Sequence, residues 1–198
     1  IMMAVKSGRA IRFPEDKVRP TGRGAIGVAG IEVENEADEV VGMICVNKDD
    51  RSRTVLVVSE KGFGKRTPVD EYRITNRGGK GVKTINVTDK TGALVGILDV
   101  SQKEDLMITC RSGVTIRMAV SGISELGRAT QGVKLIRLDD QDAIAAITVL
   151  DEEEVVEVVQ AITEQQEAQS VNGTEPVNGQ EDATNQAADE SSTDQDPA

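Results

Sequence analysis

Glycine-rich loops that also carry arginine and lysine recur in this sequence, and loops of that kind suit contact with a phosphate backbone. Glycine lets the main chain approach a ligand closely, and the cations neutralise phosphate charge, for which lysine serves as well as arginine. The fullest loop and the residue just beyond it supply Arg77, Gly78, Gly79, Lys80, Gly81 and Lys83. Equivalent loops supply Arg128, Lys134 and Arg23, and a second repeated basic set consists of Arg12, Lys65, Arg66 and Arg117.

Each of these residue types also has a plainer interpretation. The repeated glycines suit turns or β-bulges, and we favour that role for them. The polar edge of any repeat protein can be basic, yet we favour contact with nucleic acid for the arginines. Aromatic side chains do not interleave with the basic ones, so stacking on single-stranded bases is not expected. The pattern favours a duplex, bound with low sequence specificity through its backbone and its deformability.

Composition excludes most other chemistry. The 198 residues include no His and no Trp, which removes the Ser/His/Asp and Cys/His nucleophile pairs and any His metal ligand. Cys45 and Cys110 are too few for a disulfide framework or a four-thiolate zinc site, and we expect both to be buried in apolar strands. Acidic clusters at 36–39 and 139–142 suit solvated turns, and a divalent ion there stays an open alternative. No apolar run approaches the roughly 20 residues that cross a bilayer, so we expect no membrane association.

One pattern occurs three times along the chain. The units open at Gly8, Gly62 and Gly113, which are separated by 54 and then 51 residues. Counted from the opening glycine, the matched columns hold Arg at +4, an apolar or aromatic residue at +10, Arg at +15, Gly at +19, Val at +20 and Ile at +23. Self-similarity at such a period indicates a repeat architecture.

Short apolar runs rich in β-branched residues, separated by turn signals, predict strands rather than helices within each unit. We expect strands at 54–58, 62–67, 82–87, 94–100 and 106–110, with 1–5 in the same slot as 54–58 and 106–110. The turn at 89–92 predicts a hairpin that joins 82–87 to 94–100. The nearly continuous apolar runs 55–58 and 106–108 predict strands buried on both faces.

About four strands in each unit describe a blade, so the sequence predicts an all-β fold, a propeller-like array of four-stranded blades. Three blades cannot close a ring that typically needs ~4 to 8. Because the chain starts inside a blade, we expect further blades to precede it in the intact protein.

The segments 77–82 and 127–133 resemble the repeated box of the C-terminal domain of the DNA gyrase A subunit. The lead-ins at 7–13 and 61–67 and the acidic tail resemble the same family, and the resemblance covers about residues 1–150. The full box of that family reads Gln-Arg-Arg-Gly-Gly-Lys-Gly, whereas Thr75 and Asn76 hold its first two positions here. The boxes of this chain are therefore degenerate, and the complete one is expected in the preceding blades.

The resemblance implies a β-pinwheel, a six-bladed relative of the propeller with exchanged strands, of which this chain holds about three blades. It implies a domain that bends duplex DNA around its rim, which lets an A2B2 type II topoisomerase, an isomerase, introduce negative supercoils. Implied partners are double-stranded DNA together with, through the N-terminal region, the B subunit of gyrase and a second A subunit, with no membrane. No cofactor or metal is implied for this part; ATP and Mg²⁺ belong to the holoenzyme, in the bacterial cytoplasm at the nucleoid.

Two alternatives stay open beside this resemblance. The homologous subunit of topoisomerase IV has fewer and more degenerate blades, and the acidic tail and the loop at 77–81 favour gyrase over it. A propeller-like protein-interaction module would need apolar or aromatic residues on its blade faces, and this chain has almost no aromatics. Tyr72 shares its column with Val18 and Ile123, which predicts a core residue rather than a catalytic tyrosine. We expect no catalytic residue in this part of the protein.

Charge divides the chain near residue 151. The 23 Lys and Arg all precede it, with 20 acidic residues, for a net +3, whereas residues 151–198 carry 14 acidic residues and no basic ones, for a net −14. We expect a partial pinwheel at 1–150, with repeats near 8–59, 62–110 and 113–150. Residues 151–169 suit a closing strand or a short helix, and the composition of 170–198 predicts a disordered tail.

The tail suggests a testable hypothesis: it competes with DNA for the basic rim, since a segment of net charge −14 follows a segment of net charge +3. Removal of residues 151–198 should then raise the affinity for duplex DNA at low salt, as a titration of both chains would show. Equal affinities would instead favour a tail that only solubilises the protein.

Overall fold

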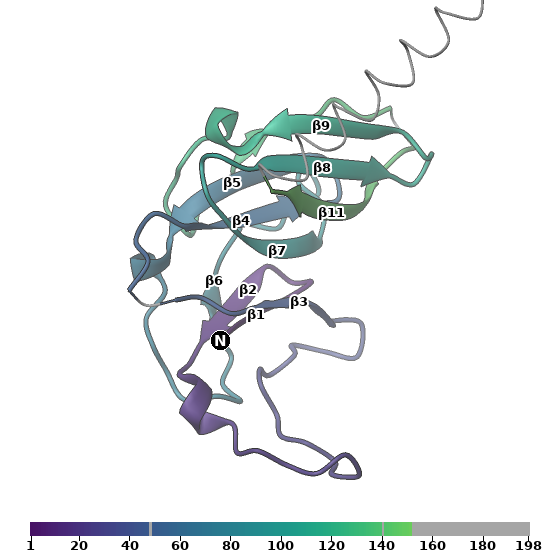
Figure 1. The fold of residues 1–198 in the computed structure, drawn as a ribbon. Helices are drawn as coiled ribbons and strands as arrows, with labels where there is room; N and C mark the ends of the chain where they lie inside the picture. The colour runs from purple at the N-terminus through teal and green to yellow at the C-terminus, as the bar shows by residue number, and fades with distance from the viewer. Residues whose placement is uncertain (48, 140, 152–198) are drawn as a thin grey trace, which may run out of the picture. The chain divides into compact units, whose positions relative to one another are not determined.

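The computed structural model describes residues 1–47, 49–139 and 141–151. The expectations for Asp140, for the rest of 151–169 beyond Asp151 and for the tail at 170–198 lie outside these residues. Within them the fold is all-β, as predicted: three antiparallel sheets joined by turns and short 3₁₀ helices (Figure 1). No helix in the described ranges is long and apolar enough to cross a membrane.

Each sheet is one blade of the repeat. The first blade contains β3 (Val40–Ile44), β1 (Met2–Val5), β2 (Arg9–Arg12) and β6 (Val82–Lys83), in that order across the sheet. The second contains, in the same sense, β7 (Leu94–Val100), β4 (Thr54–Ser59), β5 (Phe63–Pro68) and β10 (Val133–Lys134). The third contains β11 (Ile144–Leu150), β8 (Asp105–Cys110) and β9 (Thr115–Ala119). As predicted, β1, β4 and β8 take the same slot.

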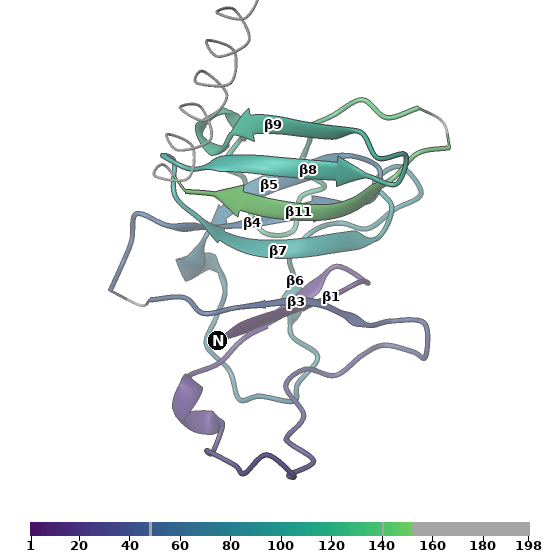
Figure 2. The ribbon, with the colours of Figure 1, turned by 45° about the vertical axis from the view of Figure 1, so that its right-hand side comes forward.

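One edge strand from each sheet, β3, β7 or β11, lies beside an edge strand of the neighbouring sheet. β7 contacts β3 of the first blade and β11 of the third, and both views show this arrangement (Figures 1 and 2). The contact is close, because a Cβ added at Gly96 of β7 would lie 2.9 Å from Cδ1 of Ile147 in β11. The opposite edge of each sheet is therefore the outer edge of its blade.

The outer strand of each four-stranded blade is donated by the following unit. A 3₁₀ helix follows each of the equivalent strands β2, β5 and β9. These helices are η1 (Glu15–Lys17), η2 (Val69–Glu71) and η3 (Val120–Gly122). After η2 the chain returns along the first blade, where Lys83 pairs with Arg9 and Val82 with Ala10. After η3 it returns along the second blade, where Lys134 pairs with Phe63 and Val133 with Gly64. This is the strand exchange that the family resemblance implied.

The exchange overturns one local prediction. The run 82–87 is a strand only at Val82–Lys83, and it does not form a hairpin with 94–100, because β6 belongs to the first sheet and β7 to the second. The turn at 89–92 is real, with Gly92 at a φ of 71°, but it joins two sheets. Turn residues report a reversal of the chain and leave open which strands pair on either side of it.

Burial follows the repeat columns closely. β4 is buried along its whole length, as predicted, whereas β8 alternates and leaves Met107 half-buried, contrary to prediction. Tyr72 is 1% exposed, which confirms a core role, and its hydroxyl lies 2.5 Å from Oγ1 of Thr84. Cys110 is buried, but Cys45 is exposed because it follows the end of β3, so the prediction for Cys45 was wrong.

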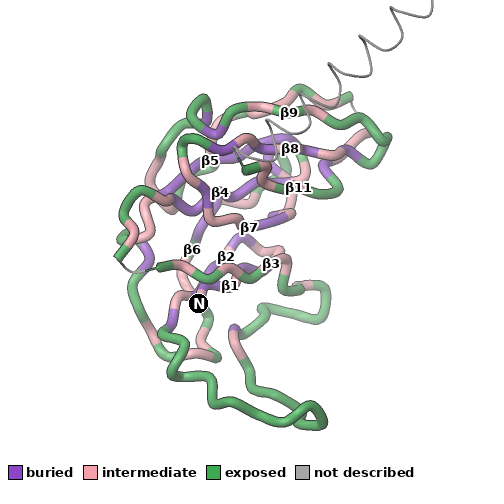
Figure 3. The backbone as a smooth tube through the Cα atoms, in the orientation of Figure 1, coloured by how far each residue is buried: buried purple, intermediate pink, exposed green. Residues whose placement is uncertain are grey.

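The loop of the first unit stands apart from its counterparts. Residues 14–29 are all exposed, as the green tube after β2 shows (Figure 3), whereas Tyr72 and Ile123 in the later units are buried. Val18, in the column of those two residues, is 37% exposed. The first blade is the first of the described chain, so residues 14–29 meet no earlier blade.

All six repeated glycines have positive φ, from 68° at Gly81 to 90° at Gly113, which confirms the turn role predicted for them. The three glycines at +19 differ in how closely other backbone atoms approach them. A Cβ at Gly81 would lie 2.5 Å from the oxygen of Ala10, and one at Gly132 would lie 2.6 Å from the oxygen of Gly64. At Gly27 a Cβ would meet nothing within 4 Å.

These glycines provide a matched test of strand exchange. Gly27→Ala carries at most the cost of a left-handed alanine, about 1–2 kcal/mol. Gly132→Ala adds a clash with the backbone of β5 and should lose roughly 1–3 kcal/mol more, as overpacked sites do. Urea denaturation of both variants measures the difference, and equal losses would mean that the close approach at Gly132 does not matter.

Candidate nucleic-acid interface

The loops that carry the glycine, arginine and lysine motif lie along the outer edges of the first two blades. We call 75–81 and 127–132 the box loops. The first is bound to the first blade by hydrogen bonds from Thr75 N to the oxygen of Arg12 (2.8 Å) and from Gly78 N to that of Gly30 (2.6 Å). The second is bound to β5, where Leu126 N donates to the oxygen of Arg66 (2.8 Å). Both loops are fixed by backbone contacts.

The arginines of the box loops tie each loop to the preceding unit. Nη1 of Arg77 donates to the oxygen of Ala29 (3.1 Å), and Nη1 of Arg128 donates to that of Lys83 (3.0 Å). Both arginines stand at +15 and both acceptors at +21 of the unit before. Arg77 also donates through Nε to the oxygen of Lys17 (3.0 Å). Part of their donor capacity is therefore used within the chain, and Arg23, the third member of the column, lies in the exposed first loop.

Lys65 supports the second box loop from beneath. Its side chain is fully buried, and Nζ donates to the oxygens of Gly127 (2.5 Å) and Arg128 (2.6 Å) and to Oγ1 of Thr130 (3.1 Å). Burial lowers the pKa of Lys65 to about 8, against the opposing charge of Glu71. Three acceptors match the three N–H groups of an ammonium, so the geometry suits the protonated form. Lys65 positions this loop and is not available to a ligand.

The three arginines at +4 differ in their burial and in their partners. Nε of Arg66 donates to the oxygen of Ile123 (2.8 Å), and Nη1 of Arg12 donates to the oxygens of Val69 (3.0 Å) and Tyr72 (3.2 Å). Arg66 is buried and Arg12 half-buried, and both hold the turn at +10 of the next unit. Arg117 is exposed and pairs with Asp105 (2.6 Å). The structure therefore does not bring Arg12, Lys65, Arg66 and Arg117 together on the surface.

The other three lysines of the predicted set, Lys80, Lys83 and Lys134, are exposed. Lys80 is exposed in the first box loop, with a distant pairing to Glu32 (3.9 Å). Lys83 and Lys134 occupy the same register position on the donated strands β6 and β10, and both are exposed. Gly78 is exposed, and Gly79 and Gly81 are half-buried beside Lys80. The exposed cations thus recur at one outer edge on successive blades.

Sequence reasoning missed two lysines at this edge. Lys61 and Lys90 line a hollow with Phe63 and Lys134 on the second blade. Lys90 lies in the turn that was assigned to a hairpin, and that assignment would place it away from β5. The usable signal was Phe63, the aromatic residue next to the opening glycine of its unit.

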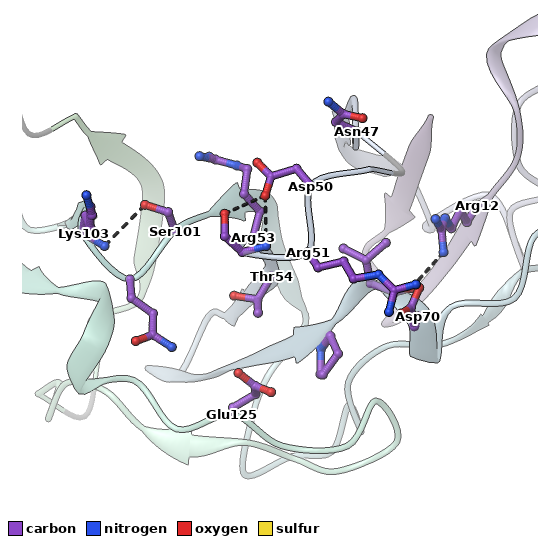
Figure 4. Close-up of a pocket in the computed structure, with 14 residues that line it drawn as sticks. Arg12, Asn47, Asp50, Arg51, Arg53, Thr54, Asp70, Ser101, Lys103 and Glu125 are labelled. Carbon is purple, nitrogen blue, oxygen red and sulfur yellow. Dashed lines mark hydrogen bonds between the residues drawn. The ribbon is translucent and has the colours of Figure 1, made fainter.

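A larger hollow of about 460 Å³ lies at the strand ends between the first two blades (Figure 4). Its lining mixes both signs of charge: Arg12, Arg51, Arg53 and Lys103 with Asp50, Asp70 and Glu125. The acidic side chains offset the basic ones, and Arg12 and Arg53 already donate to oxygens of the chain, which together do not favour a polyanion there. Among the described residues no group of three or more Cys, Asp or Glu is arranged to hold a metal ion.

Arg53 is the centre of a partly buried ion network in this hollow. Nε donates to Oδ2 of Asp99 (2.6 Å), Nη1 to Oε1 of Glu104 (2.8 Å) and Nη2 to the oxygen of Asp99 (2.8 Å). Burial raises the pKa of Asp99, and the guanidinium of Arg53 opposes that rise. The network joins the start of β4 to the end of β7, so Arg53 serves the fold.

Comparison with known proteins gives a consistent result. The model of the family described as DNA gyrase C-terminal domain, beta-propeller, matches residues 1–47, 53–101 and 104–151. The DNA gyrase A subunit of Staphylococcus aureus strain MRSA252 is 44% identical over 185 residues, which cover 90% of this chain and 21% of that protein. The chain therefore spans about a fifth of the length of the curated relatives it matches.

Solved structures show the same fold. A DNA gyrase A C-terminal domain matches with a TM-score of 0.64 and 26% identity, over 76% of this chain and 50% of that one. The C-terminal domain of DNA topoisomerase IV matches with a TM-score of 0.72 and 17% identity, over 83% and 50%. The second likeness concerns the fold alone.

The role of Arg53 can be tested through stability. Arg53→Met leaves Asp99 and Glu104 without their cation and should cost roughly 3 kcal/mol, as removal of one partner from a buried pair does. Arg117→Met, which breaks the exposed pair with Asp105, should cost about 1 kcal/mol or less. If urea denaturation gave equal losses, the network would not be what stabilises this junction.

Proposed function

Because the chain belongs to the DNA gyrase C-terminal domain family, we propose that it binds duplex DNA along the outer edges of its blades and bends it. In this proposal it serves as the non-catalytic, DNA-wrapping part of a bacterial type II topoisomerase, most specifically gyrase. The 44% identity to a DNA gyrase A subunit supports that choice over the topoisomerase IV homologue.

The repeated lysine at the donated strand carries the proposal. Lys83 and Lys134 stand in equivalent register on β6 and β10, and Lys80 is exposed in the loop before β6. Cations repeated on successive outer edges form a track of the kind that a phosphate backbone follows. Arg77 and Arg128 lie at the bases of the same loops, where their remaining N–H groups can add to the contact.

The remaining predicted basic residues have other roles in the proposal. Lys65, Arg66 and Arg12 position the loops, and Arg23 and Arg117 belong to the exposed ends of the repeat, where an adjoining blade would extend the track. Contacts of this kind read no base edges, so specificity should come from the ease of bending.

The wider setting is proposed from the family. The intact protein would assemble with the B subunit of gyrase and a second A subunit through regions outside this chain, in the bacterial cytoplasm. ATP and Mg²⁺ would act in the holoenzyme, and this part would supply DNA wrapping for negative supercoiling.

A salt series on a random-sequence duplex tests the proposal. The double variant Lys83→Ala/Lys134→Ala should bind more weakly and lower the slope of log K against log salt by about 1 for each lysine. Arg51→Ala/Lys103→Ala makes the same change in net charge at the hollow of mixed charge and should leave the slope nearly unaltered. No binding by the unaltered chain at low salt would contradict the proposal.

A further inference from the structure

Three lysines surround Phe63 at the outer edge of the second blade. Nζ of Lys90 lies 5.5 Å from the centre of the Phe63 ring, and Nζ of Lys134 lies 5.8 Å from it. Lys61 lines the same hollow, which has a volume of about 270 Å³ and is completed by Leu138, Asp139 and Asp142. Three separate segments of the chain thus bring an ammonium group to one place. We call these residues the Phe63 lysine cluster.

Backbone hydrogen bonds hold the three segments together. Lys61 N donates to the oxygen of Thr91 (3.0 Å), which joins the β4–β5 turn to the turn that carries Lys90. Leu135 N donates to the oxygen of Gly62 (2.8 Å), which joins β10 to the same turn. Phe63 is 7% exposed, so its ring is a fixed surface for the two cations. The cluster is therefore preorganised by the fold.

Three ammonium groups and two carboxylates, those of Asp139 and Asp142, line the hollow, so its net charge is positive. Within the described part of the chain, none of the three ammonium groups forms an ion pair with a carboxylate. Asp142 lines the hollow, but its carboxylate accepts hydrogen bonds from Ser112 N (3.1 Å) and Oγ (2.6 Å) and from Ala143 N (2.8 Å). Neighbouring ammonium groups repel one another, and an anion between them offsets that repulsion.

The first blade has a different side chain at the position equivalent to Phe63. Arg9 occupies the place of Phe63 there, opposite Lys83, and Nε of Arg9 binds Oε1 of Glu34 at 2.6 Å. At that edge the chain supplies its own carboxylate to Arg9. At the corresponding edge of the second blade, three lysines line the hollow together with Asp139 and Asp142.

We propose that the Phe63 lysine cluster binds the phosphodiester backbone of duplex DNA as a contact site separate from the box loops. This inference rests on the proposed function, which supplies the duplex. It places the path of the DNA across the body of the second blade, from the donated strand β10 to the turn at Lys90, in addition to the loop at 127–132.

The test compares variants of the full chain in a salt series with a random-sequence duplex. Lys61→Ala/Lys90→Ala should lower the affinity and reduce the salt slope by about 2, since each phosphate contact contributes about 1. Lys61→Arg/Lys90→Arg keeps both charges and should retain the slope. Arg51→Ala/Lys103→Ala is the control of equal charge, and circular dichroism checks that each variant is folded.

The outcomes separate this inference from the proposed function. The cluster is supported if Lys61→Ala/Lys90→Ala loses slope while Lys61→Arg/Lys90→Arg and the control both keep it. An unchanged slope in Lys61→Ala/Lys90→Ala, while Lys83→Ala/Lys134→Ala loses slope, overturns the cluster and leaves the proposed function intact. Equal losses in Lys61→Ala/Lys90→Ala and the control also overturn it, because long-range charge would then explain both. Failure of the unaltered chain to bind would contradict the proposed function itself.

Discussion

The antiparallel pairing of each donated strand with the preceding blade is the interaction on which the rest of this structure depends. Only two residues of β6 and two of β10 pair in this way, and Gly81 and Gly132 let the backbone approach closely enough for the pairing to form. The pairing fixes where each box loop begins and ends. It also brings Arg12 and Arg66 to carbonyl oxygens of the next unit, so the blades are joined by both strands and side chains.

Basic residues in this fold consequently have two distinct uses. Lys65, Arg66 and Arg53 satisfy backbone or carboxylate oxygens inside the protein, where burial would make an unpaired charge costly. Lys80, Lys83 and Lys134 stand on outer edges, where the charge is free to attract a polyanion. Under the proposed function, the same residue type therefore serves the fold in one column and DNA binding in another. Position relative to the donated strand decides which.

Much of the fold was predictable because the repeat supplies its own alignment. Apolar runs within the repeat identified β1, β4, β5, β7 and β8, and matched columns identified the core role of Tyr72 and the turn role of the glycines. The hairpin at 82–100 was mispredicted because a turn is local while strand pairing is not, and Cys45 because its strand ends one residue earlier. The positions of the glycine-rich loops were predictable, whereas their contact with DNA stays a prediction. Burial of Lys65 and Arg66 depends on contacts between units, and the approach of Lys90 to Phe63 depends on a contact between the start of β5 and a later turn of the same unit. No local pattern contains either contact.

The central claim is that DNA follows the outer edges of the blades, and lysine reactivity measures this most directly. Modification of surface lysines, read by mass spectrometry with and without a random-sequence duplex, should show protection at Lys80, Lys83 and Lys134. Lys103, at the hollow of mixed charge, should react equally in both samples. Protection of Lys103 while Lys83 and Lys134 stay reactive, with the duplex bound, would contradict the account.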